Sequence, residues 1–278
     1  MAEITAELVK QLRDETNVSM MECRKALQEA GGDLAKATTV LRKRGVAVAA
    51  KKASRAADQG LIASATADGG KVVSLVEVIC ETDFAAKNDS FKKLVDQVAA
   101  NACQSDAGLA DQMTDAIVAK IAEIGENIVV GRCARYALGG KGRVASYIHQ
   151  GGKVGVVAEI GCENSATEEN AAFRELVKDV TLQIAAANPR YLVAADVPAD
   201  VIAAEREIYA SQVKDKPPQI VDKIVDGKLK KFYTDTCLVD QIFVKDTKIT
   251  IAALLAAKSK ELGDKLTIRR FVRYQIGK

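Results

Sequence analysis

The first 44 residues contain three short amphipathic segments. Apolar side chains recur there three or four positions apart, which predicts three helices within residues 3–44. The apolar positions are Ile4, Leu8, Val9 and Leu12, then Met20, Met21, Ala26 and Leu27, then Leu34, Ala37, Val40 and Leu41. Gly31 and Gly32 end the second helix, and Asp33 is placed to cap the third. We expect a three-helix module over residues 1–45.

A basic segment follows this module. Residues 42–55 read RKRGVAVAAKKASR, with six basic residues and no acidic one. Such a run is typical of a solvated linker, although it is also suited to phosphate contacts. We therefore expect a basic linker over residues 46–59.

The chain beyond this segment contains an internal repeat. When residues 60–98 are moved by 82 positions onto residues 142–180, 15 of 39 aligned positions are identical without a gap. Chance would give about two or three identities, so we infer a duplicated unit. Each copy reads as strand, Gly-Gly turn, strand and helix. The predicted strands are 61–67, 71–80, 143–149 and 153–162, and the helices begin near Asn88 and Asn170.

Further elements complete the two halves. A helix over 111–124 and a strand over 127–138 give a first core unit over residues 60–140. The second unit, residues 141–278, contains prolines that predict a helical hairpin at about 188–232, followed by a strand-like segment, a helix and a strand over 238–244, 249–262 and 266–276. The fold class is therefore α+β, with two related antiparallel sheets packed with helices. The hairpin exposes apolar surface unless it is covered, so a homodimer through the hairpin or the core stays open.

The composition leaves little material for catalysis. The 278 residues include one His and no Trp, and none of the six Cys falls in a C-x-x-C or C-x-x-H arrangement. We read the Cys as reduced, mostly buried thiols of a cytoplasmic protein, and expect no metal, no cofactor and no enzyme activity. The formal net charge is only +3, so we expect no DNA partner. No apolar run reaches the roughly 18 residues of a membrane span, so no membrane partner is expected either.

A comparison of the two copies separates shared positions from divergent ones. The shared pairs Cys80 with Cys162 and Phe91 with Phe173 are expected in the core. Between the second strand and the helix, TDFAAKN in the first copy faces NSATEEN in the second, so that Phe84 opposes Ala166. An aromatic residue in a polar loop without support from its duplicate is either a buried plug or an exposed wedge for a partner.

Three other residues are open to two interpretations. His149, the single His, ends the strand before the second Gly-Gly turn and is either a partner contact or a surface residue of no consequence. Met20 and Met21 begin the second helix and suit either a corner of the core or an adaptable contact surface. The Gly-Gly-Lys-Val of each copy lacks the frame of a P-loop and is explained by the hairpin turns.

Several stretches resemble the bacterial elongation factor Ts family. Residues 5–45, TAELVKQLRDETNVSMMECRKALQEAGGDLAKATTVLRKRG, are similar to that family's ubiquitin-associated-like N-terminal module. Residues 76–91, VEVICETDFAAKNDSF, match its most diagnostic stretch. Supporting matches are IGENI at 124–128, the Tyr-x-His of Tyr147 to His149, and GKLKKFYTDTCLVDQIFV at 227–244. The resemblance covers almost the whole chain, including the duplicated core and the hairpin insertion.

The resemblance implies a nucleotide-exchange factor for the translational GTPase elongation factor Tu. In that family a Thr-Asp-Phe loop inserts into the GTPase and helps to dislodge Mg²⁺, which loosens the phosphates of GDP. The matching positions here are Thr82, Asp83, Phe84 and Ala85, the last standing where Val is usual. Further implied contacts are Ile124, Gly125 and His149 in the core, and Arg13, Met20, Met21 and Arg24 in the N-terminal module. The family commonly continues into a C-terminal helical module after the position of Lys278, and without its contact we expect weaker binding.

Two other classes of protein are weighed against this one. An RNA- or ribosome-associated binder would use the basic segment 42–55 and the basic tail of Arg269, Arg270 and Arg273, but the near-neutral net charge argues against it. A thiol enzyme would need a paired His, which the sequence does not offer near any Cys.

Overall fold

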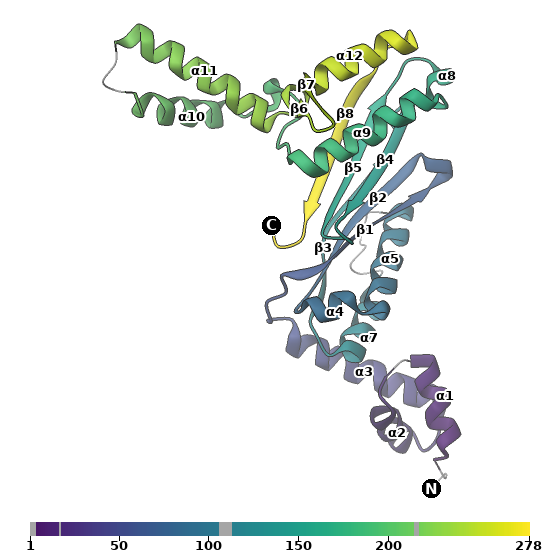
Figure 1. Cartoon of the computed structure of the whole chain (residues 1–278). Coiled ribbons are helices and arrows are strands. Elements are labelled where there is room, and N and C mark those ends of the chain that lie inside the picture. The colour runs from purple at the N-terminus through teal and green to yellow at the C-terminus, as the bar shows by residue number, and fades with distance from the viewer. Residues whose placement is uncertain (1–3, 17, 106–112, 214–216) are drawn as a thin grey trace.

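The computed structural model describes residues 4–16, 18–105, 113–213 and 217–278. Helices and antiparallel sheets share this part of the chain, which confirms the predicted α+β class. In Figure 1 the N-terminal helices lie at one end of an elongated molecule, two sheets form its centre, and a pair of helices projects at the other end.

The N-terminal head, residues 4–45, consists of α1 (Ala6–Thr16), α2 (Met20–Glu29) and the first part of α3 (Leu34–Lys52). Its core is formed by the buried side chains of Val9, Leu12, Cys23, Ala26, Leu27, Ala37 and Leu41. The Asp33 side chain accepts the Lys36 N–H at 3.0 Å and so caps α3, as the sequence predicts. The three expected helices are present.

The predicted linker over 46–59 is wrong for its first half, because α3 continues to Lys52. Val48 and Ala49 pack against the core beneath the first sheet. Gly45 lies so close to α7 (Thr114–Ile124) that a Cβ there would be 3.0 Å from Val118 Cγ1. These small and apolar residues recur at helical spacing, so this stretch of α3 packs one partly buried face against the core and carries basic residues on its other side.

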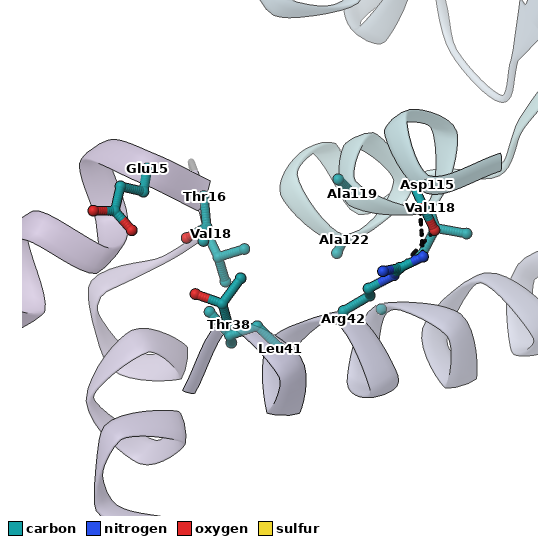
Figure 2. A pocket seen from close by; sticks show the side chains of 11 residues that line it. Glu15, Thr16, Val18, Thr38, Leu41, Arg42, Asp115, Val118, Ala119 and Ala122 are labelled. Atoms are coloured by element: carbon teal, nitrogen blue, oxygen red, sulfur yellow. Dashed lines mark hydrogen bonds and ion pairs between the residues drawn. The ribbon is translucent and has the colours of Figure 1, made fainter. Parts of the chain in front are cut away.

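A salt bridge also joins the head to the core (Figure 2). Arg42 Nε on α3 donates to Asp115 Oδ1 at the start of α7, at 3.1 Å. The pair closes one side of a cavity of about 350 Å³, whose other walls come from α1, α3 and α7. A helix and an ion pair therefore replace the expected flexible connection.

Two three-stranded antiparallel sheets form the centre of the molecule. The first has the order β1 (Gln59–Ala67), β2 (Val72–Cys80) and β3 (Ile128–Ala137). The second has the order β4 (Gly142–His149), β5 (Val154–Gly161) and β8 (Thr267–Gln275). The first two strands of each sheet are the predicted pairs, and the glycines of both Gly-Gly turns have positive φ, as the turn requires.

Corresponding helices follow the central strand of each sheet. They are α4 (Asp83–Lys87) and α5 (Asp89–Gln104) in the first half, and α8 (Ser165–Glu168) and α9 (Ala171–Ala187) in the second. The Asn88 and Asn170 side chains accept the N–H two residues ahead, each at 2.8 Å, which confirms both predicted helix starts. Phe91 and Phe173 are fully buried, as expected for shared core positions.

The second half contains further elements after α9. These are α10 (Ala199–Ser211), α11 (Pro218–Thr236), β6 (Ile242–Phe243), β7 (Asp246–Thr250) and α12 (Ile251–Leu262). α10 and α11 lie side by side in Figure 1, and Arg206 pairs with Asp226 between them at 3.0 Å. The strand expected over 238–244 is wrong in its first part, because residues 238–240 form a 3₁₀ turn that buries Leu238. Within the described ranges no helix has the length and apolarity needed to cross a membrane.

Two corresponding polar clusters join the sheets. In the first, buried Glu77 accepts two hydrogen bonds from Arg132, and Arg132 also donates to Gln275 O on the opposite sheet at 2.8 Å. In the second, buried Glu159 accepts from Arg270 Nε at 2.7 Å. That arginine in turn donates to a backbone carbonyl of β3, that of Ala137, at 2.9 Å.

The same arginines also contact tyrosines across the sheet boundary. Arg132 lies 4.7 Å from the ring centre of Tyr274, and Arg270 lies 4.2 Å from that of Tyr136. Each partner in one cluster has its counterpart at the same place in the other sheet. The two sheets are thus joined by two equivalent clusters, each made of one carboxylate, one arginine and one tyrosine.

Glu159 is the more heavily bonded of the two carboxylates. It is only 2% exposed, and it also accepts from Arg269 Nη1 at 2.9 Å and from the Gly139 N–H at 2.8 Å. Burial acts to raise its pKa, but these hydrogen bonds outweigh burial and hold the pKa below its ordinary value of 4.5.

We expect Glu159→Gln to lower the free energy of unfolding by roughly 2 kcal/mol, because two arginines lose their countercharge. The loss is limited to this size because both arginines are partly exposed to water. Urea denaturation measures this loss. As a control, Asp226→Asn breaks the exposed pair with Arg206 and should change stability by less than about 1 kcal/mol. Equal effects of the two substitutions would contradict the role given to Glu159.

The contribution of Glu159 should also depend on pH. A carboxyl whose pKa is lowered by folding stabilises the protein above its unfolded pKa and loses that effect as the pH falls. The stability difference between the unsubstituted protein and Glu159→Gln should therefore be constant near neutral pH and shrink below about 4.5. Urea denaturation of both proteins over this pH range checks the sign, and a difference that grows on acidification would contradict it.

Candidate partner-binding site

The segment expected to be a loop at residues 82–88 contains the one-turn helix α4. Thr82 is its N-cap, since Thr82 Oγ1 accepts the Ala85 N–H at 3.2 Å. Asp83 places a carboxylate in the first turn, where it favours the helix. The loop expectation is therefore wrong, because this Thr-Asp pair begins a helix too short to show periodicity.

α4 turns a small apolar face inward and one aromatic side chain outward. Ala85 and Ala86 are buried against the first sheet. Phe84 is 80% exposed, and Lys87 Nζ lies over its ring, 5.9 Å from the ring centre. Of the two interpretations of Phe84, the buried plug is wrong and the exposed position is confirmed.

Thr82 is fixed on three sides. Its N–H donates to Glu126 Oε2 at 2.9 Å, and its hydroxyl donates to Glu126 Oε1 at 2.6 Å. The Cys80 thiol donates to the Thr82 carbonyl at 3.2 Å. Sequence reasoning missed Glu126, although it lies within the IGENI stretch at 124–128, because its partner is 44 residues away.

Ile124 and Gly125 lie beside this contact. Gly125 ends α7 in a left-handed conformation, with φ 83°, and is exposed. Ile124 is partly buried and packs against the core of the first half. The turn that they make leads directly to Glu126, so the structure brings both residues to the base of α4.

The charges around α4 link it to the second half. Asp83 pairs with Lys87 at 2.7 Å, and this hydrogen bond, more than any other contact, holds the pKa of Asp83 below its ordinary value. The charge of Lys153, the last residue of the turn between β4 and β5, contributes to the same shift. Because Ile62 N–H donates to Gly152 O at 2.7 Å, that turn lies against β1.

His149 stands at the start of this turn. It is exposed, and its Nδ1 lies 3.0 Å from the Tyr147 hydroxyl, with the two rings stacked at 5.8 Å. The Tyr-x-His pattern thus forms one aromatic unit at the junction of the two sheets. Residues 82–85, 124 and 125 thus lie at or next to α4 and its Glu126 contact, whereas His149 is connected to the first sheet through the turn that contacts β1.

The residues predicted in the head form a separate surface. Met20 is 42% and Met21 71% exposed, so the interpretation as a core corner is wrong. Together with Arg24 they line a shallow groove of about 400 Å³ between α1 and α2. Arg13 is exposed on α1 but does not line this groove. The head surface is separated from α4 by the length of α3 (Figure 1).

The thiols and the acidic groups complete the chemistry of the described chain. Cys80 and Cys162 are buried as predicted, and burial raises the pKa of Cys80 to about 11. Within the residues described, no three His, Cys, Asp or Glu side chains are grouped so as to hold a metal ion. The prominent feature is an exposed aromatic side chain on a helix whose cap is fixed by hydrogen bonds, and exposed aromatic residues of this kind are typical of protein-binding surfaces.

Comparisons with known proteins agree with this class. The family model described as Elongation factor TS matches residues 81–278. Elongation factor Ts of Nitratidesulfovibrio vulgaris is 43% identical over 276 residues, which cover 99% of this chain and 96% of the relative. Those of Nitratiruptor sp. and Clostridium perfringens are each 43% identical, with 99% of this chain and 93% of the relative covered.

The chain therefore belongs to the elongation factor Ts family. This membership places it among the elongation factors of protein biosynthesis.

Proposed function

We propose that this chain is a guanine-nucleotide exchange factor for elongation factor Tu. It binds the GTPase with GDP bound and promotes GDP release by inserting the segment Thr82, Asp83 and Phe84, which helps to dislodge Mg²⁺ from the GTPase. Family membership supports the partner. The single structural observation that carries the proposal is Phe84, an 80% exposed aromatic ring on a helix whose cap is fixed by three hydrogen bonds.

The action needs no catalytic group on this chain. Burying the Phe84 ring in the partner contributes about 2 kcal/mol to binding. If the pocket that receives the ring exists only in the open state of the GTPase, this free energy favours that state over the GDP-bound one. The factor by which this chain weakens GDP binding then equals the factor by which GDP weakens the binding of this chain. Because α4 is already ordered, little of the gain is lost in fixing the side chain.

Two further surfaces extend the proposed contact. Ile124 and Gly125 precede Glu126 at the base of α4, and the turn after His149 lies against β1, so we expect one face of the GTPase to meet both halves of the core. Arg13, Met20, Met21 and Arg24 offer a second, apolar and basic contact on the head. A homodimer through α10 and α11 or through the core stays a prediction.

The alternative of an RNA- or ribosome-associated binder loses its support in the basic tail. Arg269 and Arg270 are bound to Glu159, and Arg273 donates to Ala185 O at 3.3 Å. In the basic segment, Arg42 pairs with Asp115. Most of these cations serve the fold, which leaves the exchange factor as the better-supported function.

Release of labelled GDP from the cognate GTPase tests the proposal directly. We expect the chain, in amounts below those of the GTPase, to accelerate release, because an exchange factor is regenerated in each cycle. A large excess of unlabelled GDP should weaken the complex by the same factor as the chain weakens GDP binding. No acceleration over the GTPase alone would overturn the proposed function.

We expect Phe84→Ala to reduce the acceleration of GDP release by roughly 30-fold, since about 2 kcal/mol of burial is lost. Circular dichroism and urea denaturation should be unchanged because the ring packs against no core residue. Ile208→Ala on α10, also an exposed apolar position, is the matched control and should leave release unaffected. An unchanged rate with Phe84→Ala would remove Phe84 from the mechanism.

A further inference from the structure

The orientation of α4 has to come from its neighbours. A helix of five residues cannot maintain itself, because isolated helices need at least about 12 residues to be marginally stable. Ala85 and Ala86 pack one face of it against the sheet, but contacts of two methyl groups are too few to fix the orientation of the helix. Asn88 N–H donates to Ala85 O at the end of the helix, and the restraint at its start is Thr82, whose backbone and side chain both bond to Glu126.

The Glu126 carboxylate determines which way the Thr82 hydroxyl points. That hydroxyl has a single proton, which goes to Glu126 Oε1 at 2.6 Å. Its lone pairs are then free to accept the Ala85 N–H, which is the bond that caps α4. Glu126 therefore selects the rotamer in which Thr82 caps the helix, and it fixes the Thr82 backbone with its second oxygen.

The second half of the molecule contains the same device without an aromatic residue. Asp264, shortly before β8, accepts the Asn164 N–H at 3.0 Å, just as Glu126, shortly before β3, accepts that of Thr82. Asp264 also accepts the Thr167 hydroxyl at 2.6 Å. The helix that it holds, α8, has Ala166 where α4 has Phe84. A carboxylate that fixes the start of a short helix is thus present in both halves. Only the helix of the first half, α4, carries an exposed aromatic side chain at this position.

We propose that Glu126 is a positioning residue for nucleotide exchange, which holds the Thr82 cap and thereby directs Phe84 toward the GTPase. This inference rests on the proposed function and names a group that acts through α4 without touching the partner. When the carboxylate is lost, α4 frays at its start, and the partner has to order it before Phe84 can insert.

Glu126→Gln is the test, because it keeps the size of the side chain and removes its charge and one acceptor. We expect the maximal rate of GDP release to fall roughly tenfold, the effect of losing one charge-assisted hydrogen bond. The concentration of this chain that gives half the maximal rate should change less, since the head and His149 still bind. Asp264→Asn removes the equivalent restraint from α8 and should leave release within about twofold of the unsubstituted protein.

Two further measurements separate positioning from simple loss of stability. Thr82→Val combined with Glu126→Gln should slow release no more than the more severe of the two single substitutions, because Glu126 acts only through Thr82. Hydrogen exchange on the free chain should show faster exchange of the Ala85 and Ala86 amides in Glu126→Gln and no change in Asp264→Asn.

The outcomes are distinguishable from those of the proposed function. If the unsubstituted chain accelerates release, Phe84→Ala slows it and Glu126→Gln does not, the positioning role is overturned while the exchange function stands. If Asp264→Asn slows release as much as Glu126→Gln, the effect is one of general stability and the inference is likewise overturned. Unchanged amide exchange in Glu126→Gln overturns the structural step even when no GTPase is present.

Discussion

The arginine that crosses from one sheet to the other is the interaction on which the remaining structure depends. Arg132 and Arg270 each neutralise a buried carboxylate on the central strand of their own sheet and then bond to a backbone carbonyl of the other. Buried charges are tolerated only when they are paired in this way, and these contacts join two sheets whose facing sides also share a buried apolar cluster that includes Leu75 and Val157. That placement brings the turn after His149 against β1.

Duplication separates what the fold requires from what binding requires. Cys80 and Cys162 both donate to the carbonyl at the N-cap of a short helix, and Asn88 and Asn170 both begin the next one. The two halves share these contacts because each sheet has to bury its central strand under a helix. Phe84 does not contribute to the core, because its ring is exposed. The second half has Ala166 at the equivalent position, so the fold does not require an aromatic residue there.

Much of this organisation could be predicted from residue patterns alone, since strands, Gly-Gly turns and capping asparagines are local signals. The shift of 82 positions revealed both copies up to α5 and α9. The third strands escaped it, because Arg132 and Arg270 correspond at a shift of 138, beyond the inserted α10, α11, β6 and β7, while α12 is the counterpart of α7. Likewise, α4 was too short to show a helical period. The end of α3 was predicted to be a linker from its basic residues, although Gly45, Val48 and Ala49 are spaced as one helix face that packs against α7 and the core. Glu126 could not be assigned because a contact across 44 residues leaves no local trace.

The unbroken helix α3 has a consequence for how the two contact surfaces work together. Its 19 residues span about 28 Å at 1.5 Å per residue; the first part belongs to the head, and the part from Arg42 onward packs against α7 and the core. A flexible linker would let the second surface explore a wide volume after the first has bound, so its effective concentration would fall as the linker lengthens. A helix packed on α7 holds that distance constant, which gives high avidity to a partner whose two sites have the matching separation and very little to any other.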